Sequence, residues 1–425
     1  MTRFTSIFSR LLLAVPFVVA APFDKGEMHT EVIPRFDHLP ISNPNAANII
    51  PNRYIVVYNN TFDDDAISAK EESFISSMKK RNLGKRGLGG DWLPTDFDSF
   101  KINKWRATSL AADDDMINEI FNNDEVAYVE ADTTISIHAT SRQADAPAGL
   151  ARISHAQAGA SEYVFDDSAG KGITVYVIDT GIKITHSEFD GRATWGANFV
   201  DQVNDDQNGH GSHVAGTIGG STFGVAKKVD LVAVKVLNAG GKGPNSGILK
   251  GLQFAIDDAQ QKGKKGRAVV NMSVGGEYSE AVNRAIEALR NANIVPVVAA
   301  GNDAQDAANV SPASAPNAIT VGAIDATNDS RAYFSNYGQS VDIYAPGVDV
   351  LSCGIQSESD TAYMSGTSMA SPHVAGLAAY LMALRNVTQA DQVVEIMKNL
   401  ASKTGAAVND NAQGTTSLIA NNGNL

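Results

Sequence analysis

Uninterrupted apolar runs, rich in valine and isoleucine, recur through the second half of the chain and alternate with longer stretches of helical spacing. Runs of this composition are typical of strands that are covered on both faces. The stretches between them, which include 248–262 and 279–291, have the length that the crossover helices of a parallel sheet require. The pattern therefore predicts an α/β domain. Its strands are expected at 173–178, 231–236, 268–272 and 294–299.

The first part of the chain has shorter elements without this alternation, which predicts a small α+β domain of about 80 residues. We expect its strands at 54–58, 97–102 and 126–130 and its helices at 66–80 and 110–122. Residues 22–52 contain several prolines and little periodicity, so we expect an extended leader there. Residues 140–147, rich in alanine, serine and aspartate, are expected to form an exposed joint between the domains.

The amino terminus has the organisation of a secretory signal peptide. Arg3 and Arg10 precede an apolar run over 11–21, which ends in two alanines. A membrane anchor is the alternative, but the run is well short of the about 20 residues that a spanning helix needs. We therefore expect residues 1–21 to be removed and the protein to be secreted.

Composition and charge exclude several classes of protein. The 425 residues are 43% hydrophobic and 19% charged, which is typical of a globular protein. The net charge of −13 leaves no cationic stripe that could neutralise phosphates, so nucleic-acid binding is not expected. Cys353 is the single cysteine, and an intramolecular disulfide is therefore impossible. We interpret Cys353 as a small, partly buried residue, and a cysteine nucleophile is the alternative.

The segment from Gly366 to Ala375 places Ser368 between a glycine turn and an apolar run over 374–384, which is expected to form a buried helix. A serine at a helix start lies among free backbone N–H groups at the positive end of the helix dipole. An oxyanion that forms beside such a serine can be held there. The alternative is that Ser368 is only an N-cap, a common role for serine.

Three further polar residues lie where strands or helices are expected to begin or end. Asp179 directly follows an expected strand, and Asn302 follows another. His210 stands between glycines before an apolar stretch that reads as a helix. Taken singly, each has an ordinary explanation as a turn residue or a structural histidine. We adopt that explanation for His213, which belongs to the same segment as His210.

Together, these residues supply every group that acyl transfer through serine requires. The reaction needs a nucleophile, a base that takes its proton, a carboxylate that orients the base, and donors for the oxyanion. Ser368, His210, Asp179 and Asn302 are suited to these roles in that order. The order aspartate, histidine, serine along the chain is the order found in subtilisin.

The chain accordingly resembles the subtilases, the subtilisin-like serine proteases, and within them the proteinase K branch. The resemblance begins at about Gly149 and is carried by 176–181, 224–228 and the segments around His210 and Ser368. It implies a subtilisin-like parallel sheet with helices on both faces. Residues 54–57 and 126–132 resemble strands of the inhibitory propeptide domain of the family, an inhibitor I9-type domain.

The resemblance also implies a domain organisation. A signal peptide (1–21) would precede a propeptide (22–140), whose small α+β inhibitor-like domain covers about 53–138, and a catalytic domain (141–425) would follow. The first domain would act as an intramolecular chaperone and inhibitor, with its tail over 133–140 in the active-site cleft. Autocleavage between His138 and Asp145 would then release the enzyme.

The resemblance assigns a role to each residue of the site. His210 is the general base, Asp179 orients it, and Ser368 attacks the scissile carbonyl. Asn302 and the backbone N–H of Ser368 form the oxyanion hole. Substrate is expected to bind as an added strand, so specificity should be broad, with hydrophobic or aromatic side chains preferred in the primary pocket. The residues expected to bind substrate are Gly241, Lys242, Gly243, Ser273, Val274, Gly275, Ala299, Ala300 and Gly301.

No cofactor is expected for the chemistry, whereas the resemblance implies structural calcium. Its site would be formed by the carbonyls of Pro316 and Ala318 and the carboxylate of Asp342, since calcium prefers oxygen ligands. The alternative is that Asp342 caps a turn. Sequons that make N-glycosylation possible are present at Asn59, Asn309, Asn328 and Asn386. Asn271 also fits the motif, but it lies in an expected core strand and is discounted.

Two other functions are open. A proprotein-processing protease would need acidic pocket residues and an added β domain, for which the short segment after the Ser368 helix has no room. A catalytically silent subtilase fold that acts as a binding protein would not need the four chemical residues, which are all present. We therefore expect a monomeric secreted endopeptidase whose partners are protein and peptide substrates and its own propeptide, with no membrane partner.

Overall fold

The computed structural model describes residues 39–43, 49–86, 92–133 and 140–424. The chain divides into two compact units, Met1–Thr134 and Ile135–Leu425, each with its own apolar core. The predicted signal peptide lies outside the described residues. Among the residues that are described, no helix is long and apolar enough to span a membrane.

The second unit is built on a seven-stranded sheet whose neighbouring strands are parallel. The α/β prediction is therefore confirmed, and the four expected strands lie within one residue of their predicted bounds. In their order across the sheet, the strands are β15 (Ile343–Pro346), β14 (Ile319–Ile324), β12 (Ile294–Ala299), β10 (Ala268–Met272), β7 (Thr174–Asp179), β9 (Asp230–Lys235) and β8 (Ala193–Asn198).

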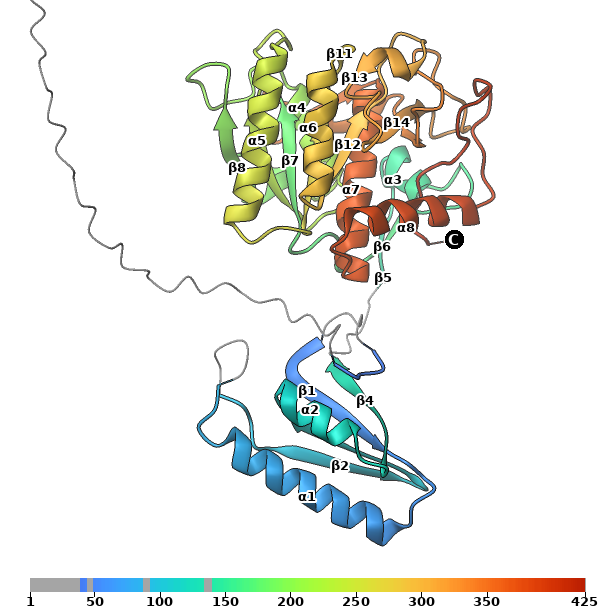
Figure 1. Cartoon of the computed structure of the whole chain (residues 1–425). Helices are drawn as coiled ribbons and strands as arrows, with labels where there is room; N and C mark the ends of the chain where they lie inside the picture. Colours follow the sequence, from blue (N-terminus) through green and yellow to red (C-terminus); the bar gives the residue numbers. More distant parts are fainter. Residues whose placement is uncertain (1–38, 44–48, 87–91, 134–139, 425) are drawn as a thin grey trace, which may run out of the picture. The chain divides into compact units, whose positions relative to one another are not determined.

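Each face of this sheet has its own apolar core. In β7, Val175 and Val177 belong to one core, while Tyr176 and Ile178 belong to the other. Because both faces are covered, the strands show no alternation of polar and apolar residues. The helices are α4 (His210–Gly219) and α7 (Thr367–Arg385) on the first face, and α5 (Asn245–Gln261) and α6 (Glu280–Asn291) on the second (Figure 1).

The carboxyl ends of the central strands bring the polar residues of interest to one end of the sheet. Asp179 is the last residue of β7, Ser273 follows β10, and Asn302 lies just beyond β12. Helices α4 and α7 begin with His210 and Thr367, so His210 and Ser368 lie in first turns. In open parallel sheets, this is the end at which ligands bind.

Short elements complete the second unit. The expected exposed joint at 140–147 is wrong in part, because Thr140–Gln143 forms β5, which pairs with β6 (Tyr163–Asp166). Only this pairing makes so short and polar a segment a strand. The other elements are α3 (Ala148–Ile153), η1 (Ser187–Phe189), β11 (Gly276–Glu277), η2 (Ala307–Asn309), β13 (Val310–Ser311), β16 (Val350–Cys353), β17 (Thr361–Met364) and α8 (Ala390–Lys403).

The first unit is a four-stranded antiparallel sheet with two helices, which confirms the predicted α+β domain. Its sheet order is β2-β3-β1-β4. The elements are β1 (Ile49–Tyr58), α1 (Asp64–Asn82), β2 (Phe97–Ile102), β3 (Trp105–Ala111), α2 (Asp114–Phe121) and β4 (Val126–Thr133).

Two details of this unit differ from the prediction. The helix expected from residue 110 begins only at Asp114, and the residues before it form β3, whose register between β1 and β2 makes it a strand. The expected leader is also partly structured. Strand β1 already begins at Ile49, and Leu39 and Ile41 are buried in the core of this unit.

Candidate active site

Ser368 lies in the first turn of α7, and Gly366 takes the N-cap position. The interpretation of Ser368 as a simple N-cap is therefore wrong. The Ser368 hydroxyl donates a hydrogen bond to the Ser273 carbonyl at 3.1 Å, and the Ser273 hydroxyl donates to the Ser368 carbonyl at 2.8 Å. This reciprocal pair fixes the start of α7 against the loop after β10.

Asp179 and His210 form a hydrogen-bonded pair beside this helix start. His210 Nδ1 lies 2.8 Å from Asp179 Oδ1; the Asp179 side chain is fully buried, while a quarter of the His210 side chain is exposed. With the Nδ1 proton directed to the carboxylate, Nε2 is left as the acceptor. Burial opposes protonation of His210, but the Asp179 carboxylate outweighs it and raises the pKa of His210 above its ordinary value.

The Asn302 amide is held in one orientation by Thr367. Asn302 Oδ1 accepts hydrogen bonds from the Thr367 backbone N–H at 2.8 Å and from the Thr367 hydroxyl at 2.9 Å. Because the oxygen is used in this way, the Nδ2 group is the end that remains for a ligand. Nδ2 and the Ser368 backbone nitrogen both lie close to Gly366, on the side where a Cβ atom would project. Two donors therefore lie near each other beside the Ser368 hydroxyl.

Thr367 was not predicted as a site residue. Its hydroxyl also accepts a hydrogen bond from the Gly301 backbone N–H at 3.0 Å, so it connects the loop after β12 to the start of α7. The sequence showed a threonine next to Ser368, but its partner is 65 residues away along the chain. Only the folded chain shows that Thr367 orients Asn302.

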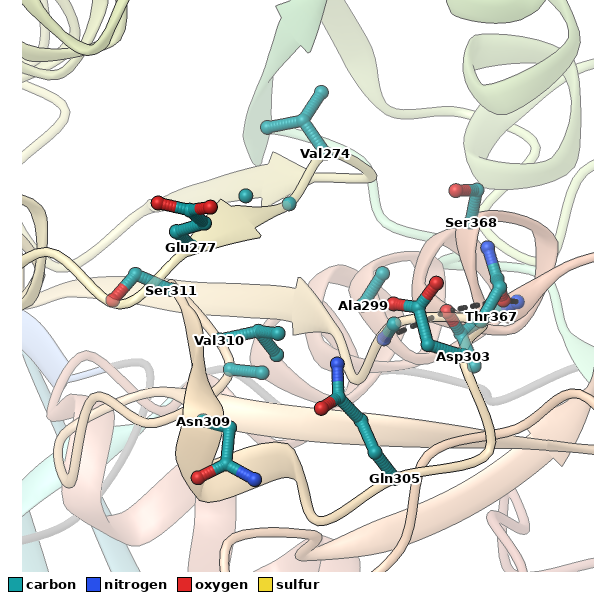
Figure 2. A pocket seen from close by; sticks show the side chains of 15 residues that line it. Val274, Glu277, Ala299, Asp303, Gln305, Asn309, Val310, Ser311, Thr367 and Ser368 are labelled. Carbon is teal, nitrogen blue, oxygen red and sulfur yellow. Dashed lines mark hydrogen bonds between the residues drawn. The ribbon is translucent and has the colours of Figure 1, made fainter.

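Two adjoining cavities extend from these groups. The first, of about 540 Å³, is lined by residues that include Ser368, Asn302 and Thr367. Figure 2 shows Ser368 and Thr367 at one end of it. The second, of about 530 Å³, contains His210 and residues of the 241–243 loop. Of the predicted substrate-binding residues, those that line one or both cavities are Gly241, Lys242, Gly243, Ser273, Val274, Gly275, Ala299 and Gly301.

Ala300 is the exception among the predicted substrate-binding residues. It is fully buried in an apolar cluster with Ala307 and Tyr344 and lines neither cavity. Its backbone is occupied as well, because its carbonyl accepts a hydrogen bond from Asn336. Ala300 therefore supports the wall of the cavity without facing the ligand space.

Two carboxylates line the first cavity outside the segments that were expected to wall it. Glu277 belongs to β11, and Asp303 follows Asn302. Figure 2 shows Ser368 at one side of the cavity and Glu277, with Ser311, at the opposite side. In the described part of the chain, neither carboxylate forms an ion pair with a lysine or arginine. The cavity therefore combines apolar walls with a negative rim.

The Asp342 carboxylate, which is the one side chain of the predicted calcium site, is already bound by other groups. Asp342 Oδ1 accepts from Lys398 Nζ at 2.8 Å, and Oδ2 accepts from the Thr320 backbone N–H at 3.0 Å. Both oxygens are thus in use, and one of them already faces a cation. Nor do the described residues contain a group of three or more His, Cys, Asp or Glu that could hold a metal. The alternative for Asp342, bonding a backbone N–H, agrees with these contacts.

The remaining polar candidates are structural or peripheral. His213 is fully buried, its Nε2 lies 2.9 Å from the Val350 carbonyl, and burial lowers its pKa to about 4, which confirms a structural histidine. Cys353 is also fully buried, and burial raises the pKa of its thiol. A thiol of this kind is inert, so the nucleophile alternative is not supported.

The sequons differ in accessibility. Asn309 and Asn328 are exposed, whereas Asn59 and Asn386 are half-buried. Asn309 also lines the first cavity, so a glycan there would stand at the mouth of the cavity. Asn271 is fully buried in β10, in agreement with its exclusion.

Comparisons with known proteins give a consistent result. Residues 170–416 match the model of the subtilase family, peptidase S8. The chain is 44% identical to subtilisin-like protease 2 of Pseudogymnoascus destructans, over 98% of this chain and 99% of the relative. It is 46% identical to alkaline protease 1 of Emericella nidulans, over 92% and 96%. The crystal structure of a cold-adapted subtilisin-like serine proteinase is 39% identical, with a TM-score of 0.60, and covers 66% of this chain and 99% of the other.

Proposed function

We propose, from the premise that this chain belongs to the subtilase family of serine endopeptidases, that Asp179, His210 and Ser368 are its catalytic triad. The observation that carries this proposal is the 2.8 Å contact between His210 Nδ1 and the buried Asp179 carboxylate, with His210 in the cavity that adjoins the one lined by Ser368. An Nδ1 proton donated to Asp179 would leave His210 Nε2 as the base, and the position of Ser368 at a helix N-terminus suits a nucleophile. The family needs no cofactor for its chemistry and generally binds structural calcium.

In the acylation half-reaction, the Ser368 hydroxyl exchanges the Ser273 carbonyl for His210 Nε2 as its hydrogen-bond acceptor. His210 then takes the proton while the Ser368 oxygen bonds to the scissile carbonyl carbon. Asp179 stabilises the imidazolium that results. The protonated His210 gives its proton to the leaving amine as the peptide C–N bond breaks, and an acyl-enzyme remains. In deacylation, water takes the place of the amine and the same proton transfers occur in reverse order.

The negative charge that develops on the carbonyl oxygen is stabilised by Asn302 Nδ2 and the Ser368 backbone N–H. Thr367 matters because it uses the Asn302 oxygen and so presents the nitrogen to the oxyanion. An amide that is already oriented does not have to reorganise during the reaction, and its contribution is therefore large.

The substrate is proposed to be a polypeptide in extended conformation, held by main-chain hydrogen bonds along 241–243 and 273–275. Val274, Ala299 and Val310 give the first cavity apolar walls, which supports a preference for hydrophobic or aromatic P1 side chains. Because most contacts of this binding mode are with the backbone, the specificity is proposed to be broad.

The protein is proposed to be a secreted, monomeric zymogen. The separate first unit, Met1–Thr134, would serve as intramolecular chaperone and inhibitor, in agreement with its α+β sheet. Residues 134–139, which include part of the proposed cleavage window, lie outside the described residues. Glycosylation is proposed for Asn328, whose exposed side chain is not among those that line the two cavities.

Labelling with a fluorophosphonate tests the triad directly. The processed protein should be labelled, and a Ser368→Ala variant should not be. A His210→Ala variant should be labelled far more slowly, because the base is lost while the hydroxyl remains. Processed, folded protein without Ser368-dependent labelling would support a catalytically silent binding protein instead.

A further inference from the structure

Asp206 lies in the loop that leads into α4, and its carboxylate is almost completely buried at 2% exposure. Its Oδ1 accepts hydrogen bonds from the Thr180 hydroxyl at 2.8 Å and from the backbone N–H groups of Asn208 and Gly209 at 3.1 and 2.9 Å. Its Oδ2 accepts from the backbone N–H and the hydroxyl of Ser212 at 2.9 and 2.7 Å. A carboxylate with this many donors is held in a single position.

The donors come from both sides of the Asp179–His210 pair. Thr180 directly follows Asp179, and its hydroxyl also accepts a hydrogen bond from the Gly211 backbone N–H at 2.9 Å. Gly211 directly follows His210. The hydrogen bond between Thr180 and Gly211 therefore joins the end of β7 to the start of α4, one residue beyond Asp179 and one beyond His210. Asp206 holds the same Thr180 hydroxyl from the loop before α4.

The start of α4 depends on this carboxylate. Its N-cap is Gly209, with a φ of 98°, which has no side chain to bond the free N–H groups. Asp206 accepts instead from two of them, the N–H groups of Gly209 and Ser212, and places a negative charge at the positive end of the helix. On the other side of the loop, the buried Lys235 donates from Nζ to the Asp205 carbonyl at 3.0 Å, so the loop is anchored from β9 as well.

We propose that Asp206 is a positioning residue for catalysis, which fixes the His210 helix start to the end of β7 and stabilises the protonated imidazole across the buried loop. This inference rests on the proposed triad. It adds to the triad a second buried carboxylate that does not touch the imidazole.

The electrostatics of the site agree with this role. Asp206 helps Asp179 to raise the pKa of His210. The titratable groups that act on His210 are these two carboxylates and His213, which lies on the same helix and stays neutral because burial lowers its pKa to about 4. Removal of the Asp206 charge should therefore lower the pKa of His210.

The test is Asp206→Asn, with Asp205→Asn as the matched control. The substituted amide keeps the shape of the carboxylate, but it turns an NH₂ group toward N–H donors and loses the charge. We expect kcat to fall about 5- to 30-fold with little change in KM, because one to two hydrogen bonds of about 1 kcal/mol each are lost from the loop that positions His210. The pH midpoint of kcat/KM should also move to lower pH. Asp205 is exposed, so the Asp205→Asn variant should keep the kcat and the pH midpoint of the original enzyme.

Titration of the His210 imidazole by NMR in the Ser368→Ala background, in which both of the proteins compared retain the first unit, gives a readout that does not depend on turnover. The His210 pKa should be lower in Asp206→Asn than in the parent. If Asp206→Asn does not fold, Ser212→Ala and Thr180→Val are tested together. Each removes one hydrogen bond to Asp206 and keeps the charge, and their other losses differ, the bond from Lys183 N–H in one and from Gly211 N–H in the other. These variants should lower kcat without moving the pH midpoint.

The possible results separate the two proposals. A folded Asp206→Asn variant with unchanged kcat and an unchanged His210 pKa overturns the positioning role, and so do Ser212→Ala and Thr180→Val variants that both retain full kcat. A parent enzyme without Ser368-dependent activity overturns the proposed triad, whereas the NMR titration still reports on the role of Asp206.

Discussion

At Asn302, two hydrogen bonds from one neighbour decide what the side chain can do. A free amide presents either its oxygen or its nitrogen, and only the nitrogen can stabilise an oxyanion. Thr367 uses the oxygen through its backbone N–H and its hydroxyl. At the residue scale, the site is therefore formed as much by the residues that orient Asn302 and His210 as by those two residues.

Asn302→Ala should lower kcat by about 10²- to 10³-fold with little change in KM, the range known for the equivalent loss in subtilisin. Thr367→Val keeps the backbone donor and loses only the hydroxyl, so a smaller loss of about fivefold is expected for about 1 kcal/mol. Steady-state kinetics on a peptide substrate measures both. An Asn302→Ala enzyme with more than half of the original kcat would exclude this amide from the oxyanion hole.

The pH dependence of activity follows from the sign of the His210 shift. The base must be neutral, so kcat/KM should rise with pH through the pKa of His210 in the free enzyme. Since the Asp179 carboxylate raises that pKa, the midpoint should lie above the ordinary histidine value of 6.5. A pH–rate profile checks this. A midpoint below 6.5, or activity that declines between about pH 5 and pH 8, contradicts the mechanism.

At the scale of elements, the positions at which strands and helices begin and end decide which side chains reach the cavities. Strand β12 ends just before Asn302, and β11 and β13 bring Glu277 and Ser311 to the far side of the same cavity. The pairing of Glu277 with Val310 in these two short strands places one of the two carboxylates of the negative rim. Neither strand can be predicted from the pattern of hydrophobic and polar residues, because each has only two residues.

The negative rim should make acidic P1 side chains the poorest class of substrate. Glu277→Gln is expected to raise kcat/KM for a P1 glutamate peptide about fivefold relative to the P1 phenylalanine peptide, as for about 1 kcal/mol of repulsion in water. Glu280→Gln is the control, since Glu280 is exposed at the start of α6 and does not line the cavity. An equal change for both variants would show that Glu277 does not face the P1 side chain.

Helix α8 affects the predicted metal site through Lys398. Lys398→Gln should cost about 1 kcal/mol or less, because the ion pair with Asp342 is partly exposed. The same change removes a cation from the Asp342 carboxylate. Added calcium should therefore raise the Tm of Lys398→Gln more than the Tm of the original protein, while Lys403→Gln on the same helix should respond as the original protein does. If calcium raised the Tm of the original protein, Lys398→Gln and Lys403→Gln equally, Lys398 would not be the group that keeps calcium from the Asp342 carboxylate.

At the scale of the whole molecule, the chain consists of two units with separate cores. The first unit has a four-stranded sheet, and the residues of its core cluster all belong to this unit. A unit with its own core that lies at one end of the chain can be removed by one cleavage. This organisation agrees with the proposed zymogen.

Maturation should depend on Ser368. The secreted wild-type protein is expected to begin between residues 138 and 145, whereas Ser368→Ala, expressed in the same host, should retain the first unit. Amino-terminal sequencing and intact mass spectrometry give both results. A mature terminus far from this window, or normal processing of Ser368→Ala, would show that another protease performs the cleavage.

The sequence by itself determined the class of the fold and the candidates for the chemical groups. Strands and helices buried in the core produce apolar runs that are visible without a structure. Asp179 and Asn302 follow strand runs of this kind, and His210 and Ser368 precede helical ones. The sequence could not show strand β3, the pairing of β5 with β6, or the ion pair between Lys398 and Asp342. These features depend on partners that are distant along the chain.

Tertiary structure alone decided which polar residues serve the site. Thr367 and Asp206 look like ordinary turn and helix-start residues, and only folding brings Thr367 to Asn302 and connects Asp206 to Thr180 and Ser212. It also placed Ala300 outside both cavities and Glu277 on the wall of the first. The physical reason is that hydrophobic periodicity is local, whereas hydrogen-bond partners and cavity walls are set by the packing of separate elements.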